Sequence, residues 1–173
     1  RQYAVQNKGI GIGAHGIRSG KDFSNPIGYA CSVQCGDHTS MTDLPLDGYG
    51  SEVWEVFNDS AVLCNFNGFG LPKNFKFDFY TAVTGLELTR KGWAKCGGLK
   101  TLQIQRALLL LGGPDVKWNP RVDDDNPSRF YEPLPSGPCK GKAADRTSVR
   151  QSVQKYYEQA GWDENGVPKS ETL

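Results

Sequence analysis

The chain has 173 residues, a formal net charge of +1 and five cysteines. A charge this close to neutral gives no reason to expect a nucleic acid or an anionic membrane as partner, and no apolar run approaches the roughly 20 residues that a membrane span needs. The odd number of widely spaced cysteines is a poor disulfide framework, which favours reduced thiols in a cytoplasmic protein.

The first 50 residues are rich in glycine and turn-forming residues. A G-x-G-x-x-G pattern is met only by Gly11, Gly13 and Gly16, with no strong strand before it and no clear helix after it. A dinucleotide site is therefore disfavoured, because the phosphate-binding pattern needs both flanking elements. We expect instead a loop that brings its backbone close to another segment.

Hydrophobic periodicity predicts helices in the rest of the chain. Ser51, Thr89 and Asp145 are suitable N-caps, and Gly85 and Gly161 stand where two of the helices should end. The predicted helices cover residues 51–66, 74–84, 90–111 (with a weak point at Gly97-Gly98) and 146–160.

Residues 114–144 form a proline-rich stretch with few signals of secondary structure, and no segment is a confident strand. So long an irregular stretch is uncommon in a compact domain, and it suggests packing against another surface. The three acidic residues Asp123 to Asp125 are expected to be solvated or to cap a helix. The predicted fold is mainly α: one irregular helical domain over residues 1–173, with long Gly/Pro-rich loops.

The segment Asp59-Ser-Ala-Val-Leu-Cys64 lies in the first predicted helix. Five residues along a helix correspond to about 140° around its axis, so the two side chains should face different neighbours. If both are functional, they hold two different objects side by side. An exposed Asp and a buried structural Cys would give the same spacing.

This segment resembles the D-x-x-G-L-C signature of the tungsten-pterin aldehyde ferredoxin oxidoreductase family, with Val62 in place of the usual Gly. The resemblance runs in order through nearly the whole chain, and the tail is its most specific part. The similar segments are residues 29–38, 81–89, 98–113 with Arg106, 129–138 and 156–168.

The resemblance implies roles for individual residues. Asp59 and Leu63 would contact a pterin of the metal cofactor, and Cys64 would be the last thiolate ligand of a [4Fe-4S] cluster. His38 would lie beside the metal as a proton donor or substrate contact, a role that suits an imidazole. The alternative for His38 is an ordinary loop histidine bonded to Asp37 or Thr39.

The other cysteines have no such motif behind them. Cys31 and Cys35 form C-x-x-x-C before His38, and small buried thiols are favoured there over metal ligands. Cys96 and Cys139 are expected to be structural.

In the family, a preceding amino-terminal domain and a middle domain complete the site, and the middle one supplies three thiolates from C-x-x-C-x-x-x-C. The present sequence has no C-x-x-C, and a [4Fe-4S] cluster normally takes four thiolates. The chain begins with Arg1 rather than Met, and we expect residues to precede it in the natural protein. It corresponds to the carboxy-terminal domain and should be inactive alone.

The whole enzyme would carry a tungsten (or molybdenum) bis-pterin and a [4Fe-4S] cluster. It would oxidise aldehydes to carboxylic acids, or catalyse the reverse, and pass electrons to ferredoxin or an iron-sulfur subunit. The alternative is a non-catalytic, stand-alone relative of this domain that packs against or binds a partner.

Overall fold

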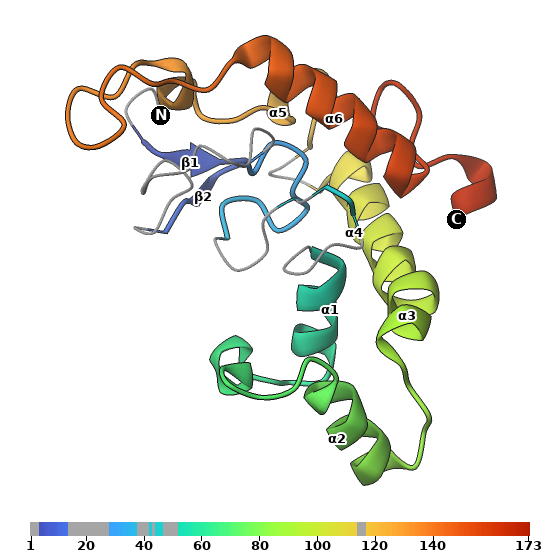
Figure 1. The fold of residues 1–173 in the computed structure, drawn as a ribbon. Coiled ribbons are helices and arrows are strands. Elements are labelled where there is room, and N and C mark those ends of the chain that lie inside the picture. Colours follow the sequence, from blue (N-terminus) through green and yellow to red (C-terminus); the bar gives the residue numbers. More distant parts are fainter. Residues whose placement is uncertain (1–3, 14–27, 38–41, 43, 47–51, 114–116) are drawn as a thin grey trace.

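The structure is a computed structural model that describes residues 4–13, 28–37, 42, 44–46, 52–113 and 117–173. Most of its regular structure is helical, as predicted (Figure 1). The elements in chain order are β1 (Gln6–Asn7), β2 (Ile10–Gly11), α1 (Glu52–Ser60), η1 (Asn65–Gly68), α2 (Phe75–Thr84), α3 (Arg90–Trp93), the π-helical η2 (Ala94–Gly98), α4 (Leu99–Leu111), α5 (Pro120–Asp123), η3 (Ser128–Tyr131), α6 (Arg146–Ala160) and η4 (Ser170–Thr172).

The glycine-rich start of the chain forms a short antiparallel hairpin. Gln6 pairs with Gly11, and Asn7 pairs with Ile10. Lys8 and Gly9 make the turn with φ of 49° and 91°, the left-handed conformations that a tight hairpin turn needs. A Cβ at Gly36 would collide with the carbonyl oxygen of Ile10, so the hairpin lies against the loop that precedes His38. Gly16, the last glycine of the G-x-G-x-x-G pattern, lies outside the described residues.

The helices α3, η2 and α4 follow one another as a single long rod (Figure 1). Thr89 caps its start, because its hydroxyl oxygen accepts a 3.1 Å hydrogen bond from the backbone N–H of Gly92. The weak point predicted at Gly97-Gly98 falls in the π-helical segment, which the rod passes through without breaking. A Cβ at Gly98 would lie 2.6 Å from Cγ1 of Val53, so this segment lets α1 approach closely.

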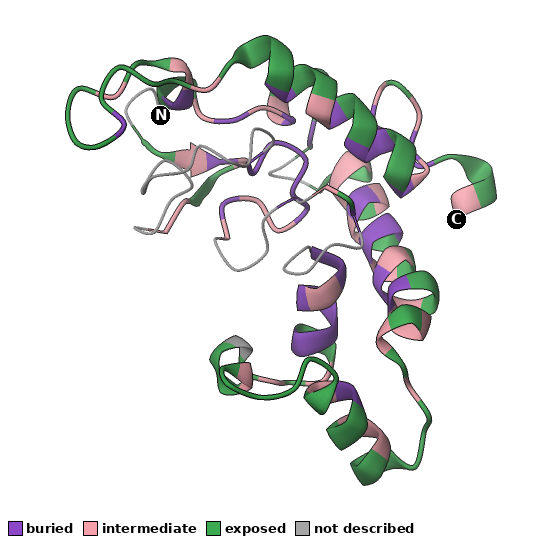
Figure 2. Ribbon diagram, viewed as in Figure 1, coloured by how far each residue is buried: buried purple, intermediate pink, exposed green. Residues whose placement is uncertain are grey.

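Helix α6 has the bounds that the sequence predicts. Asp145 caps it by accepting a 2.7 Å hydrogen bond from the backbone N–H of Ser148, and Gly161 ends it with φ of 72°. Figure 2 shows its inner side buried and its outer side exposed. The buried residues are the five that share its apolar face in the sequence: Val149, Val153, Tyr156, Tyr157 and Ala160.

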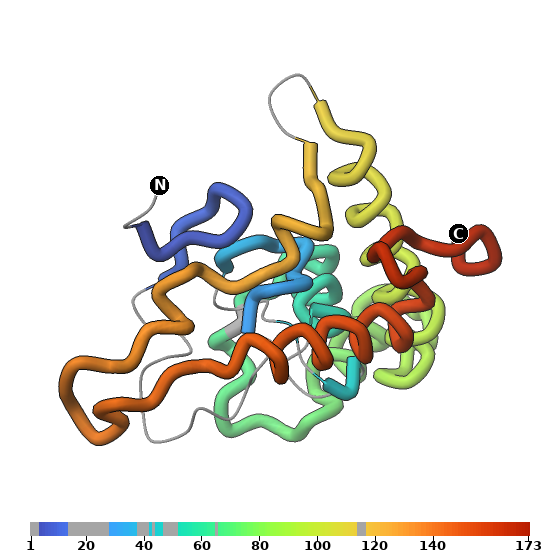
Figure 3. Tube along the Cα trace, turned by 90° about the horizontal axis from the view of Figure 1, so that it is seen from above, coloured from blue at the N-terminus to red at the C-terminus, as the bar shows by residue number. Residues whose placement is uncertain are grey.

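Residues 117–144 of the proline-rich stretch pack within the chain. Seen from above, they run beside α6 (Figure 3), and Trp118, Phe130 and Cys139 are buried. The backbone of Leu134 exchanges 2.9 Å hydrogen bonds with the backbones of Gly141 and Lys142, which closes a loop.

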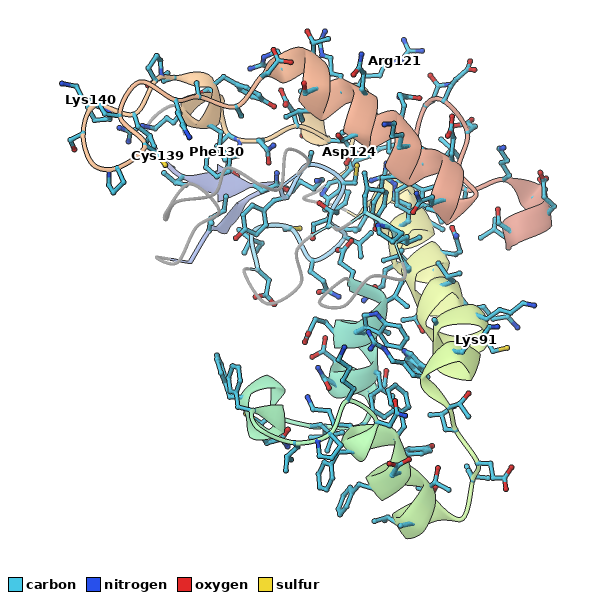
Figure 4. The ribbon with its side chains drawn as sticks, viewed as in Figure 1. Lys91, Arg121, Asp124, Phe130, Cys139 and Lys140 are labelled. Carbon is cyan, nitrogen blue, oxygen red and sulfur yellow. The ribbon has the colours of Figure 1, made fainter. Side chains whose placement is uncertain are left out.

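The expectation of a solvated acidic run is wrong for Asp124. Its carboxylate is buried and forms ion pairs with Arg106 (2.5 Å) and Lys8 (3.3 Å), and Tyr157 donates to it at 2.5 Å. Figure 4 shows Asp124 under α6, among side chains from several segments. Asp125, its neighbour, accepts hydrogen bonds from Tyr131 and Arg146. The local sequence shows only three acids, whereas the partners come from distant segments.

No helix in the described part of the chain has both the length and the apolar character needed to cross a bilayer.

Candidate functional site

The segment from Asp59 to Cys64 is a corner and not part of a continuous helix. Helix α1 ends at Ser60, so the prediction that it continues to residue 66 is wrong. The N–H of Leu63 donates to the carbonyl of Asn58 at 2.8 Å, and the N–H of Val62 donates to that of Asp59 at 3.2 Å. This is the Schellman pattern, in which the residue in the left-handed conformation is usually Gly.

Val62 occupies that left-handed position with φ of 55°. Its place in the family signature belongs to Gly, so the corner keeps a backbone shape that glycine adopts more easily. The following Cys64 is extended, with φ of −65° and ψ of 131°. Asp59 therefore lies in the last turn of a helix and Cys64 lies beyond the corner, so the helical angle of about 140° between them does not apply.

Two contacts fix this corner to α2. The ring of Phe57 stacks on that of Phe77, with centroids 4.3 Å apart and an interplanar angle of 18°. Asn58 accepts a 2.9 Å hydrogen bond from Nζ of Lys76, and its amide donates to Glu55 at 3.0 Å. Because Asn58 also accepts the backbone bond that closes the corner, the corner and α2 are held as one unit.

The predicted site residues differ in exposure. The side chains of Asp59 and Cys64 are exposed, and that of Leu63 is half-buried. The alternative of a buried structural cysteine at position 64 is therefore wrong. His38 lies outside the described residues.

Glu55 carries a buried carboxyl group on which the charges of both Asp59 and Asp37 act. It is buried on α1, one helical turn before Asp59. Burial raises the pKa of its carboxyl, the hydrogen bond from Asn58 and the charge of Lys76 oppose this rise, and the negative charges of Asp59 and Asp37 add to it. The residue directly before His38 and the predicted pterin contact thus lie near one carboxyl group.

Glu55 lies in the first turn of α1, where an acidic residue is favourable for the helix alone. The available signal was its spacing of four from Asp59, which places two like charges on one helix face.

Glu52 holds the same loop to α1 and α6. Its fully buried carboxylate accepts hydrogen bonds from the Ser32 hydroxyl (2.7 Å), the backbone N–H groups of Val33 (2.8 Å) and Gln34 (3.3 Å), and the Tyr156 hydroxyl (2.8 Å). Burial raises its pKa, and these hydrogen bonds offset part of the rise. No signal in the sequence pointed to this role.

The remaining cysteines divide by burial. Cys31 and Cys139 are buried, and burial raises the pKa of Cys31 well above its usual value. Cys35 is half-buried with φ of 61°, and Cys96 is exposed on the π-helical segment. Within the described ranges, no three His, Cys, Asp or Glu side chains group so as to hold a metal ion. Cys64 therefore fits a [4Fe-4S] cluster as one of its thiolate ligands only, and the other ligands would come from outside the described ranges.

Comparison with known proteins gives a family for this arrangement. The family model described as aldehyde ferredoxin oxidoreductase, domains 2 and 3, matches residues 1–173. A Pyrococcus furiosus protein, described as the WOR-like subunit of an aliphatic sulfonate oxidoreductase, is 54% identical over 173 residues. This alignment takes in 99% of the present chain and 27% of the relative.

Tungsten-containing aldehyde ferredoxin oxidoreductases are more distant. The one from Pyrococcus furiosus is 35% identical over 113 residues, and the one from Thermococcus kodakarensis is 32% identical over 113 residues. Each alignment covers 64% of the present chain and 17% of the relative. The chain thus spans about a quarter or less of these relatives, and the match along its whole length shows that it belongs to the aldehyde ferredoxin oxidoreductase family.

Proposed function

We propose that this chain is part of an oxidoreductase that carries a tungsten (or molybdenum) bis-pterin and a [4Fe-4S] cluster. Asp59 and Leu63 contact the pterin, and Cys64 provides one cluster thiolate. The observation that supports this most directly is the exposure of Asp59 and Cys64 on either side of one fixed corner, in a chain that matches the family throughout.

The corner sets how far apart the two groups can be. Five residues of fully extended chain span at most about 17 Å between Cα atoms. The turn at Val62 makes the distance between the Cα atoms of Asp59 and Cys64 shorter than this. The Asp59 carboxylate accepts hydrogen bonds from ring N–H groups, and the Cys64 thiolate ligates iron. The metal cofactor supplies the two-electron redox chemistry when bound. The protein's part is to hold it beside the cluster.

His38 is proposed as the group that moves a proton at the substrate. An imidazole changes protonation near neutral pH, which suits this task. Glu52 accepts hydrogen bonds from the backbone of Val33 and Gln34 and so fixes the loop before His38 to α1. The negative charge of Asp37, the residue before His38, acts on the buried carboxyl group of Glu55.

Two substrate classes are supported to different degrees. The tungsten-containing relatives are described as acting on aldehydes, whereas the relative with 54% identity is described as a subunit of an aliphatic sulfonate oxidoreductase. We therefore propose an aliphatic sulfonate or an aldehyde as substrate, with electrons passing to ferredoxin or to an iron-sulfur subunit. Measuring kcat/KM of the anaerobically purified full-length enzyme with both substrate classes distinguishes them.

Cys64→Ala tests the cluster assignment. Anaerobically prepared full-length enzyme should lose roughly four iron atoms per protomer and the matching visible absorbance. Cys96→Ala is the matched control, since Cys96 is also exposed, and it should keep its iron. Wild-type iron content in Cys64→Ala would refute the role of Cys64.

Asp59→Asn tests the pterin contact. The variant keeps the shape of the side chain but loses the charge, so we expect the content of tungsten or molybdenum to fall. Glu158→Gln, at an exposed position of α6, should keep the wild-type content. If the wild-type enzyme itself contains neither tungsten nor molybdenum nor iron, the non-catalytic alternative replaces this proposal.

A further inference from the structure

Helix α2 has two apolar faces. With about 100° per residue, Phe75, Phe79 and Val83 fall within about 80° of one another around the axis. Phe77 lies about 160° away from Phe79 on the same basis. A helix that is apolar on opposite sides is normally covered on both.

The inner face is covered by the chain itself. Phe77 is buried and stacks on Phe57, and the half-buried Tyr80 meets the same ring edge-on at 5.9 Å. The ring of Trp54 also meets Phe77 edge-on at 6.1 Å. These contacts use one side of α2 only.

The outer face of α2, defined as Phe75, Phe79 and Val83, is open to solvent. Phe79 is 51% exposed and Val83 is 68% exposed. The rings of Phe75 and Phe79 stack on each other with centroids 6.2 Å apart. Figure 1 shows α2 extending away from the body of the described chain, and Figure 4 shows side chains projecting from this helix.

The segment that follows Cys64 also exposes aromatic side chains. Phe66 and Phe69, just after Cys64, are exposed, and their ring centroids lie 5.9 Å apart. A Cβ at Gly68 would lie 3.2 Å from Cε of Lys76, so η1 lies beside α2. Exposed aromatic side chains therefore lie both on the segment after Cys64 and on the outer face of α2, and these two segments lie beside each other.

We infer that the outer face of α2 docks against the part of the full-length enzyme that lies outside these 173 residues. The relative with 54% identity is nearly four times as long as the region it shares with this chain, so such a part is expected here. The inference rests on the proposed function in one respect: Cys64 requires cluster ligands from that same part, which brings it next to η1 and α2. Large exposed apolar patches normally mark interaction sites.

A photo-cross-linking residue at position 79 of the full-length enzyme tests this. Replacing Phe79 with p-benzoylphenylalanine keeps an aromatic side chain, and mass spectrometry after irradiation identifies the cross-linked peptide. We expect a cross-link to residues outside the matched region. Lys155 of α6 is the control position, because it lies on an exposed polar face, and it should give at least tenfold less product.

Three outcomes would overturn the inference: a cross-link to a second copy of the protein, cross-links confined to these 173 residues, or a yield at position 79 no higher than at position 155. Phe79→Cys provides a second measurement that needs no cross-linker. In native full-length enzyme its alkylation should be at least tenfold slower than that of Lys155→Cys, read peptide by peptide.

Neither measurement depends on metal content. An enzyme without tungsten or iron but with the expected cross-link would refute the proposed function and leave the docking surface in place. A metal-loaded enzyme with an accessible position 79 would do the opposite.

Discussion

The hydroxyl of Tyr156, in the last long helix, donates a 2.8 Å hydrogen bond to the carboxylate of Glu52, the first residue of α1. Both side chains are fully buried. The same carboxylate accepts bonds from Ser32 and from the backbone of the following loop. One buried carboxylate thus ties together the loop before His38, the helix that carries Asp59, and α6.

Glu52→Gln should change the pH dependence of stability. Burial raises the folded-state pKa of Glu52 above its ordinary value of 4.5, so the folded protein binds this proton more tightly than the unfolded protein does. The wild-type protein therefore loses stability as pH rises from about 4.5 through the raised pKa. Gln cannot titrate, so the difference in free energy of unfolding between variant and wild type should move in favour of Gln over this range.

Denaturant unfolding of both proteins at a series of pH values measures this difference. Tyr156→Phe is the companion variant. It removes a hydrogen bond that favours the carboxylate, so it should cost about 2 kcal/mol and extend the pH-dependent range upward. A Glu52→Gln difference that does not vary with pH would contradict the expectation.

Val62→Gly should stabilise the protein. A left-handed conformation costs a residue with a Cβ about 1–2 kcal/mol, and Val62 is 90% exposed, so little packing is lost. Glycine's greater freedom in the unfolded chain offsets part of the gain, which leaves about 1 kcal/mol. Thermal unfolding measures it. Val62→Ala keeps the Cβ and should gain less; an equal gain in both variants would show that the backbone conformation is not the cause.

Asp124→Asn should destabilise the protein by about 3–5 kcal/mol, because it leaves Arg106 and Lys8 buried without their counter-charge. Denaturant unfolding measures the loss. The exposed Asp78→Asn should cost less than about 1 kcal/mol. A similar cost for both variants would mean that the buried ion pairs contribute little.

The Asp124 ion pairs also predict a loss of stability in acid. Burial alone would raise the pKa of Asp124, but the charges of Lys8 and Arg106 and the hydrogen bonds from Arg106 and Tyr157 outweigh it and hold the pKa below its ordinary value of 3.8. The stability that Asp124 provides is present above that ordinary value and is lost as pH falls through the lowered pKa. Wild type should therefore lose its advantage over Asp124→Asn below about pH 4.

Gly98→Ala should loosen α1 from the long rod. The added Cβ would lie 2.6 Å from Cγ1 and 2.8 Å from the carbonyl oxygen of Val53, which accepts the 2.8 Å hydrogen bond from the Trp93 indole. We expect a cost of about 1–3 kcal/mol, as for other overpacked sites. Gly113→Ala, where a Cβ would meet nothing within 4 Å, is the control. Equal thermal stability of the two variants would contradict the tight contact.

Periodicity and capping residues determined much of the fold. Helix α6 has its predicted bounds, and Gly85 and Thr89 end and begin helices where expected. These features depend on residues within a few positions of one another, and such local rules are visible in a sequence. The family signature around Asp59 and Cys64 is likewise a local pattern.

Tertiary contacts decided the rest. The apolar pattern after Ser60 fits a longer helix, yet the chain turns at Val62, and the contacts of Phe57 and Asn58 with α2 hold that turn in place. Asp124 lies in a run of three acidic residues that the sequence alone predicts to be solvated. Its partners Lys8, Arg106 and Tyr157 come from the first hairpin, α4 and α6. A buried charge is tolerated only where partners converge on it, and that convergence depends on segments far apart in the chain.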